Sequence, residues 1–393
     1  YNGEVTVNAG DTQKLNVGST FSYRFPNTTI FSKFNYEDAE HLGNLKSDLG
    51  NGLVESENQR HAELNYYNGG INHSLSENQT ISAEGSYIKK SGDIFSQNIN
   101  DDVEYTFSNN IDATGLGISY NNSISENSDL DIEYSQDIQD ETQQKINEIT
   151  INDTIIYKRK VFIIDYKTKV NKIHFESGYK GRFNSYNNIH DDNIVESFLF
   201  DENINALYGL TSFKWNEIAN LKFGLRYEWV NSDIDAESSN YSHLYPSAHV
   251  VYSLNPFTQL RTSFSSRVNR PSAKQLSPLP RSGDFSTIDT VGNSDLKPEF
   301  INSVEFGITR IFNKIKFDFT SYNHFIQDPI LWVQDGDNIS FDNSGSGKLS
   351  GIEALVKLKP VHNLDLRITG NYFQMNTENS SNSVLDGTTK GGY

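Results

Sequence analysis

Two short stretches contain residue types that could bind phosphate or calcium. Gly345-Ser346-Gly347-Lys348 matches part of a phosphate-binding loop, but Asp342 stands where such a loop needs Gly, and Leu349 stands where it needs Ser or Thr. Asp335-Gly336-Asp337-Asn338 matches half of a calcium loop, but Ser346 occupies the twelfth position, where Glu is required. We interpret the first stretch as a flexible entry into a strand. The second predicts a tight turn at a loop tip, with weak calcium binding as the alternative.

No arrangement of residues in the sequence predicts catalysis. The carboxylate pairs Asp101-Asp102 and Asp191-Asp192 are typical of solvated loops, and the nine His residues lack paired ligand spacing. A serine hydrolase needs a helix after its nucleophile, and the sequence offers none. We therefore expect no catalytic residue, no metal site, no cofactor and no enzyme activity.

Positive charge gathers in one long loop of an otherwise acidic chain, at Arg267, Arg270, Arg281 and Lys297. One interpretation is contact with an anion or ligand. The other, which we favour, is that these side chains fasten the loop to neighbouring carboxylates or to lipopolysaccharide phosphates, because loop Arg residues more often hold structure. Trp332 is either a ligand-stacking aromatic or part of a loop hairpin in which residues 339–341 pair back across Asp335-Gly336. The candidate ligand-binding residues are Arg267, Asn269, Arg270, Arg281 and Trp332.

The loop that carries these cations runs from Arg267 to Glu299, and we call it the long loop. Its prolines, such as Pro271 and Pro298, cannot donate to a sheet ladder, and loops of about thirty residues are usually functional. It ends in a structural motif that comprises Gly292, Asn293, Lys297, Pro298 and Glu299.

Strand patterns surround this loop and fill the rest of the chain. Alternating residues predict strands of about ten residues, the length that crosses a bilayer when tilted. They lie near 3–9, 16–24, 28–36, 61–70, 79–88, 111–121, 128–135, 155–168, 173–183, 196–214, 221–231, 244–254, 258–266, 301–311, 315–325, 350–358 and 364–374.

The predicted connections alternate between short and long. Short turns such as Ser76-Glu77-Asn78 alternate with long loops at Tyr36–Arg60, Lys89–Asn110, Gln136–Thr154 and Asn184–Glu196. Transmembrane β-barrels have this arrangement, with short periplasmic turns and long extracellular loops. We therefore expect the Arg267–Glu299 loop to lie outside the cell and to contribute to a ligand mouth.

The two faces of each strand also favour a barrel. Leu221, Phe223 and Leu225 share one face, and Lys222 and Arg226 share the other. A soluble sandwich explains each strand alone, whereas a barrel with lipid outside and a wet lumen also explains the strand lengths and loops. Aromatic residues near strand ends could form interface girdles: Phe21, Tyr23, Tyr87, Tyr227, Trp229, Tyr252 and Phe257.

Composition limits the function classes. The 393 residues carry a net charge of −18, contain no cysteine and are 12% aromatic, which argues against disorder and a disulfide framework. The acidic balance also excludes nucleic acid as a partner. We predict an all-β fold, an antiparallel meander that forms a large transmembrane β-barrel, with residues 1–393 as a single partial barrel domain.

The order of several motifs resembles the barrel region of TonB-dependent outer-membrane receptors, in particular the related outer-membrane β-barrel family. The motifs are Phe198–Lys214, Leu244–Ala248, Ser266–Pro271 and Gly292–Glu299, with Ser294 where the family usually has Pro. The resemblance implies a 22-stranded barrel with an N-terminal plug. From our count of 17–18 strands, we therefore expect the chain to be a barrel segment that lacks both ends.

The resemblance implies capture of an unknown ligand by extracellular loops, and TonB-driven import into the periplasm. The implied partners are outer-membrane lipid, lipopolysaccharide and, through the missing plug, the TonB complex, with an integral position in the Gram-negative outer membrane. Two alternatives remain open: a passive porin or an assembly or secretion barrel, and a soluble secreted all-β adhesin.

Overall fold

The chain forms one large antiparallel sheet of 18 strands in the computed structural model, which describes residues 1–10, 14–48, 53–98, 103–146, 150–216, 218–235, 237–282, 289–335, 338–361, 364–377 and 388–392. Its strands are β1 (Asn2–Gly10), β2 (Lys14–Arg24), β3 (Thr28–Asp48), β4 (Leu53–Ser76), β5 (Gln79–Asn98), β6 (Val103–Ser125), β7 (Ser128–Ile146), β8 (Thr150–Val170), β9 (Ile173–Asp191), β10 (Val195–Trp215), β11 (Ala219–Ile234), β12 (Glu237–Asn255), β13 (Thr258–Asn269), β16 (Glu299–Phe312), β17 (Ile315–Gln327), β20 (Ser346–Val361), β21 (Leu364–Thr377) and β22 (Thr388–Gly392).

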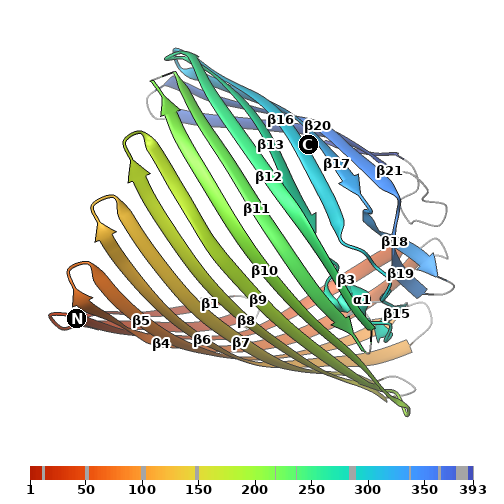
Figure 1. The fold of residues 1–393 in the computed structure, drawn as a ribbon. Helices are drawn as coiled ribbons and strands as arrows, with labels where there is room; N and C mark the ends of the chain where they lie inside the picture. Colours follow the sequence, from red (N-terminus) through yellow and green to blue (C-terminus); the bar gives the residue numbers. More distant parts are fainter. Residues whose placement is uncertain are drawn as a thin grey trace.

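A second, small sheet and one short helix lie at the end of the large sheet where the long hairpins close (Figure 1). The small sheet contains β14 (Arg281–Ser282), β15 (Asp289–Thr290), β18 (Ile330–Asp335) and β19 (Asn338–Asn343), and the helix is α1 (Ala273–Leu276). No helix in the described ranges is long and apolar enough to span a membrane.

The large sheet is a meander that curves around a central space (Figure 1). Each strand pairs with its neighbours in sequence, except that β13 pairs with β16 and β17 with β20, because the intervening segments build the small sheet and the helix. Within the described residues, β1 pairs with β2 alone and β22 with β21 alone, so these strands are the two edges. The predicted all-β meander of 17–18 strands is confirmed.

The two faces of the sheet differ as the alternation predicts. On β11, Phe223, Leu225 and Tyr227 point outward and are 48%, 50% and 43% exposed, whereas Glu228 faces the lumen and is buried. On β8 the outward residues change from apolar to basic at Lys160, about ten residues above the short turn. Exposed aromatic side chains include six of the seven predicted girdle residues: Phe21, Tyr23, Tyr87, Tyr227, Tyr252 and Phe257.

The strands are much longer than predicted. β4 has 24 residues and β6 has 23, and strand pairing continues to Asp48 opposite Leu53 and to Ile146 opposite Thr150. The prediction of long loops at 36–60, 89–110, 136–154 and 184–196 was therefore wrong, because most of these residues extend the hairpins. Beyond the apolar band both faces of a hairpin are polar, so the alternation that reveals a strand disappears.

Tight turns close the opposite end of the sheet. Asn171, Asn216 and Asn313 have φ of 56°, 55° and 45°, in the left-handed region that Asn tolerates better than most residues. These turns connect β8 to β9, β10 to β11 and β16 to β17, so sequence and geometry agree at this end.

The lipid-facing assignment makes a testable prediction at Leu225. Leu225→Arg places a charge on the outward face within the apolar band, and we expect it to lower the free energy of unfolding by about 2–4 kcal/mol. Leu210→Arg is the matched control, because Leu210 lies on the lumen face of β10 opposite Gly224 and its replacement stays hydrated. Urea unfolding in lipid vesicles measures both variants, and equal losses would contradict the assignment of faces.

Candidate ligand site at the long-hairpin end

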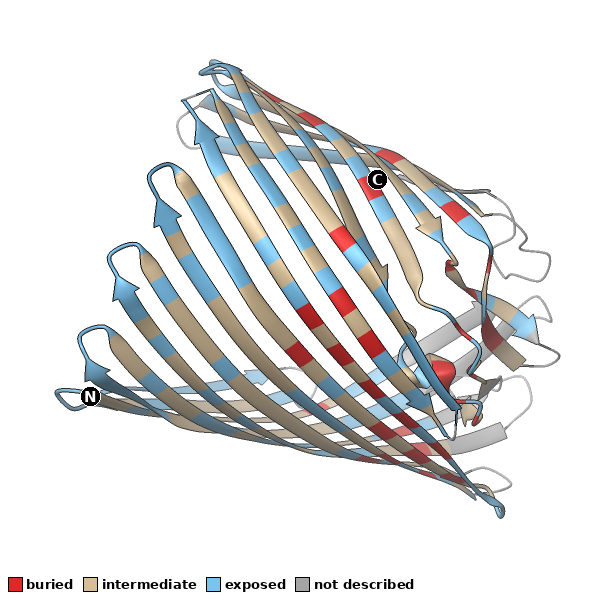
Figure 2. Ribbon diagram, in the orientation of Figure 1, coloured by how far each residue is buried: buried red, intermediate tan, exposed pale blue. Residues whose placement is uncertain are grey.

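The Arg267–Glu299 loop folds into the lumen and covers part of the inner wall, near α1 and β15 in Figure 1. The predicted loop is therefore present, but it packs inward and is shorter than predicted, because β13 continues to Asn269 and β16 begins at Glu299. Buried residues gather on the strands that lie beneath it (Figure 2).

Apolar packing holds the loop in place. Phe198 is 0% exposed and lies in a buried cluster with residues of β8, β9, the loop and the β18–β19 hairpin. An apolar cluster on the lumen face favours an inward fold of the loop, because packing of the loop on the wall removes the apolar side chains from water. Its buried members are Ile155, Tyr186, Phe198, Phe200, Leu276, Leu279, Leu296 and Phe341.

Arg270 binds the start of the loop, directly after β13, to the wall of the large sheet. Its guanidinium pairs with Glu228, donates a 2.7 Å hydrogen bond from Nε to the Tyr241 hydroxyl, and lies 3.8 Å from Glu202 Oε1. Arg226 Nε also donates to Glu228 Oε1, at 2.6 Å. The Arg270 side chain is 13% exposed and that of Glu228 is 6% exposed, so this pair is shielded from solvent.

The Gly292–Glu299 motif connects the long loop to β19. A Cβ at position 292 would overlap the Ser277 carbonyl oxygen, so the close approach there requires Gly. Asn293 Nδ2 donates to the Phe341 carbonyl at 3.0 Å, and the Lys297 backbone N–H donates to Asn343 Oδ1 at 2.7 Å. The motif therefore ties the loop to β19.

Pro298 and Glu299, the last two residues of the motif, lie where the chain returns from the loop to the large sheet. Glu299 accepts a 2.7 Å hydrogen bond from Asn269 Nδ2 and another from the Ile330 backbone N–H. Asn269 therefore supports the loop root from the other side, and Pro298 lines a cavity there.

Two further candidate residues, Arg281 and Trp332, belong to β14 and β18 of the small sheet. Arg281 donates from Nη2 to the Lys274 carbonyl at 3.4 Å. Trp332 pairs with Phe341 across the β18–β19 hairpin, with ring centroids 4.4 Å apart, and is 49% exposed. The predicted loop hairpin is thus confirmed, and the Trp332 ring still faces solvent.

Arg267 faces a basic pocket of about 360 Å³ inside the lumen. Lys180 and Arg182 of β9 and Arg226 of β11 line it with Arg267, and Glu228 is the carboxylate in the lining. Several cations around one carboxylate favour an anionic group in the pocket. Arg182 Nε is buried and has no hydrogen-bond partner among the described residues.

Two further cavities lie between the loop and the wall. One, of about 710 Å³, extends from Phe200 and Tyr241 to Pro298. The other, of about 360 Å³, lies between Tyr157 and Lys274. These volumes fall within or close to the range of small-molecule sites, and their linings combine aromatic and polar side chains.

Sequence reasoning missed the buried polar residues of this wall. His190 Nδ1 lies 2.7 Å from Asp153 Oδ1, and both residues are buried. Asn188 is 0% exposed with an unpartnered amide group in the described structure. Burial also raises the pKa of the Tyr186 hydroxyl to about 12. Polar residues in the lumen-facing register are the signal for such a wall, but only the strand register shows which of them meet.

The described residues contain no group of three or more His, Asp or Glu placed to hold a metal ion. The calcium-like stretch at 335–338 includes residues 336–337, which lie outside the described part. In the phosphate-loop-like stretch, Gly345 directly precedes β20 and has a φ of 29°, and Ser346 is the first residue of β20.

The sequence matches the model of the outer membrane protein beta-barrel family over residues 112–393. No curated protein matches the chain.

Solved structures share the fold at low sequence identity. The copper transporter OprC has a TM-score of 0.70 at 12% identity, with 97% of this chain and 61% of OprC covered. The ferric yersiniabactin uptake receptor FyuA of Yersinia pestis has a TM-score of 0.69 at 11% identity, with coverages of 99% and 64%. The RagAB peptide importer has a TM-score of 0.59 at 12% identity, with coverages of 93% and 50%. This chain spans less than two thirds of each of them.

Proposed function

Because the chain belongs to the outer membrane protein beta-barrel family, we propose that it is the barrel of a receptor that captures a ligand at its long-hairpin end and passes it into the periplasm. It is an integral outer-membrane protein of the Gram-negative cell envelope. Lipid surrounds its apolar band, and lipopolysaccharide contacts the hairpins above that band.

The observation that carries the proposal is the inward fold of the Arg267–Glu299 loop. Its apolar side chains pack on the wall, and cavities of about 710 and 360 Å³ remain between loop and wall. A passive porin needs an open aqueous lumen, whereas a receptor needs enclosed surface that contacts its ligand. The packed loop favours the receptor.

The charges near the loop indicate the chemistry of the ligand. Lys180, Arg182 and Arg267 surround a pocket in the lumen with no more than one carboxylate in its lining. We infer that the ligand presents an anionic group to this pocket, while Tyr241 and Trp332 offer aromatic surface near the mouth. Ferric siderophores and peptides both fit this description, and FyuA and RagAB are named for the uptake of such molecules.

Import against a gradient would require coupling to the TonB complex through a plug domain, and no residue of this chain is assigned to that step. The test is accumulation of four labelled probes by intact cells: a ferric siderophore, cobalamin, an oligopeptide and an oligosaccharide. Deletion of the gene should abolish the accumulation of one probe, and a protonophore should have the same effect in the parent strain. Slow entry of every small solute, unaffected by the protonophore, would instead identify a passive porin.

A further inference from the structure

A buried carboxylate without a cationic partner lies beneath the start of the long loop. Glu141 of β7 is 5% exposed and lines the cavity of about 360 Å³ between Tyr157 and Lys274. Gln139 Nε2 and Gln143 Nε2 donate hydrogen bonds to its carboxylate, at 3.3 and 2.6 Å. Both donors are neutral amides, so they stabilise the negative charge without cancelling it.

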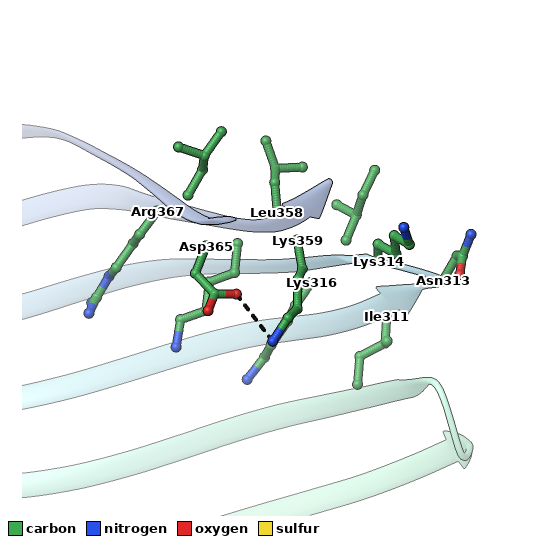
Figure 3. Close-up of a pocket in the computed structure, with 11 residues that line it drawn as sticks. Ile311, Asn313, Lys314, Lys316, Leu358, Lys359, Asp365 and Arg367 are labelled. Carbon is green, nitrogen blue, oxygen red and sulfur yellow. Dashed lines mark ion pairs between the residues drawn. The ribbon is translucent and has the colours of Figure 1, made fainter. Parts of the chain in front are cut away.

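The cations of the long loop do not supply the missing charge. Lys274 lines the same cavity and Arg281 donates to the Lys274 carbonyl, but neither forms an ion pair with Glu141. At the short-turn end, by contrast, Lys359 and Asp365 pair with each other (Figure 3), and their side chains are 54% and 78% exposed to water. Glu141 has little solvent and no counterion, an arrangement that favours a cation in the cavity.

A second polar group in this cavity also lacks a partner. Tyr186 of β9 is 3% exposed, and its hydroxyl has no hydrogen-bond partner among the described residues. A buried hydroxyl without a partner loses free energy, and its oxygen can accept a hydrogen bond from a cationic donor. The rings of Tyr157 and Phe200 line the cavity beside it, and aromatic faces attract cations.

A primary ammonium group is the cation that fits this lining. The described residues contain no group of three or more His, Asp or Glu placed to hold a metal ion. An ammonium group is compact and has three donors, so it can bond to the Glu141 carboxylate and the Tyr186 hydroxyl together. A saccharide can bond to the same atoms, but it would leave the charge of Glu141 without a counterion.

The position of the cavity next to the basic pocket defines the ligand further. Glu202 lines this cavity, Arg270 lines the basic pocket that faces Arg267, and Arg270 Nε lies 3.8 Å from Glu202 Oε1. The two pockets therefore lie on either side of one ion pair. A ligand that occupies both of them carries an anionic group and an ammonium group.

We propose that the cavity lined by Glu141, Tyr157 and Tyr186 binds an ammonium group, and that the ligand is a zwitterion, an oligopeptide with a free amino terminus. This inference rests on the proposed receptor function and narrows its ligand class. Glu141 neutralises the ammonium charge, the Tyr186 hydroxyl accepts one of its hydrogen bonds, and the Tyr157 ring offers aromatic surface beside it.

The test compares pentaalanine with N-acetylpentaalanine by isothermal titration calorimetry on the full chain in detergent micelles. At about pH 6.5 the free amino terminus is protonated, because its ordinary pKa is about 8. The wild type should bind the free peptide at least about tenfold more tightly than the acetylated peptide, because acetylation removes the charge-assisted hydrogen bonds. Glu141→Gln should bind the two peptides equally.

Two variants separate binding from folding. Asp140→Asn removes the same charge from the preceding residue of β7, which is exposed on the opposite face of the strand, and should keep the tenfold preference. Tyr186→Phe removes a hydroxyl that has no partner, so its thermal midpoint should not fall, while its preference for the free peptide should drop about threefold.

The binding data can overturn the proposal in two ways. Equal affinity of the wild type for the two peptides, or binding of neither, would exclude the ammonium site. Tighter binding of maltopentaose than of pentaalanine, lost in Glu141→Gln, would identify a saccharide site instead. Because binding in micelles needs no transport, acetylation-sensitive binding by a protein that accumulates no probe in cells would support this site and contradict the receptor function.

Discussion

Arg270→Met should release the root of the long loop from the wall. The substitution removes the guanidinium from Glu228 and the Tyr241 hydroxyl and leaves Glu202 with one cationic neighbour fewer. Breaking a shielded ion pair costs about 3 kcal/mol, because the remaining carboxylate stays away from water. We therefore expect trypsin to cut after Lys274 on the order of 100-fold faster, since cleavage follows the population of the open loop.

Arg267→Met is the control for this result. Arg267 lies three residues earlier and is exposed to the lumen, so the same substitution there should leave the cleavage rate within about threefold. Arg270→Lys should be cleaved at a rate between those of Arg270→Met and Arg267→Met, because Lys keeps the positive charge but loses the planar guanidinium. Equal cleavage of Arg270→Met and the wild type would show that apolar packing alone holds the loop.

Phe198→Ala should cause a large loss in the free energy of unfolding. Phe198 is 0% exposed and packs edge to face against Tyr186, with ring centroids 6.2 Å apart, in the cluster that joins the loop to the wall. Truncation of a buried Phe costs about 3–5 kcal/mol through lost burial and the remaining cavity. The free energy of urea unfolding in micelles measures this loss.

Leu199→Ala is the matched control, because Leu199 is the next residue along β10 and points outward at 49% exposure. Leu199→Ala should lower the free energy of unfolding by about 0.5 kcal/mol or less. Similar losses for the two variants would contradict the inward packing of β10 against the loop.

Much of the fold follows from local sequence. Alternation within the apolar band assigns Leu225 and Arg226 to opposite faces, because lipid and water impose opposite demands on neighbouring residues. Proline and asparagine positions mark the tight turns. The same reasoning fails above the band, where Asp137, Gln139 and Glu141 face a polar lumen while the outward face is hydrated, so the β7–β8 extension looked like a loop.

The candidate site could be predicted only in part. The basic residues and prolines identify the Arg267–Glu299 loop, but its inward fold depends on the distant Phe198 and Ile155. The partner of Arg270 is Glu228, which lies 42 residues earlier in the chain. Such a pair is defined by strand register and by the path of the loop, and local composition predicts neither of them.

The meander has a consequence for the order of assembly. Almost every strand pairs with the strand that precedes it, so closing each hairpin costs little chain entropy and the wall can grow strand by strand. The long loop is different, because its cluster needs β8, β9 and β10 together with Phe341 of β19. We therefore expect docking of the loop to follow the formation of β19, and a chain interrupted before β19 would lack the Phe341 contact of this cluster.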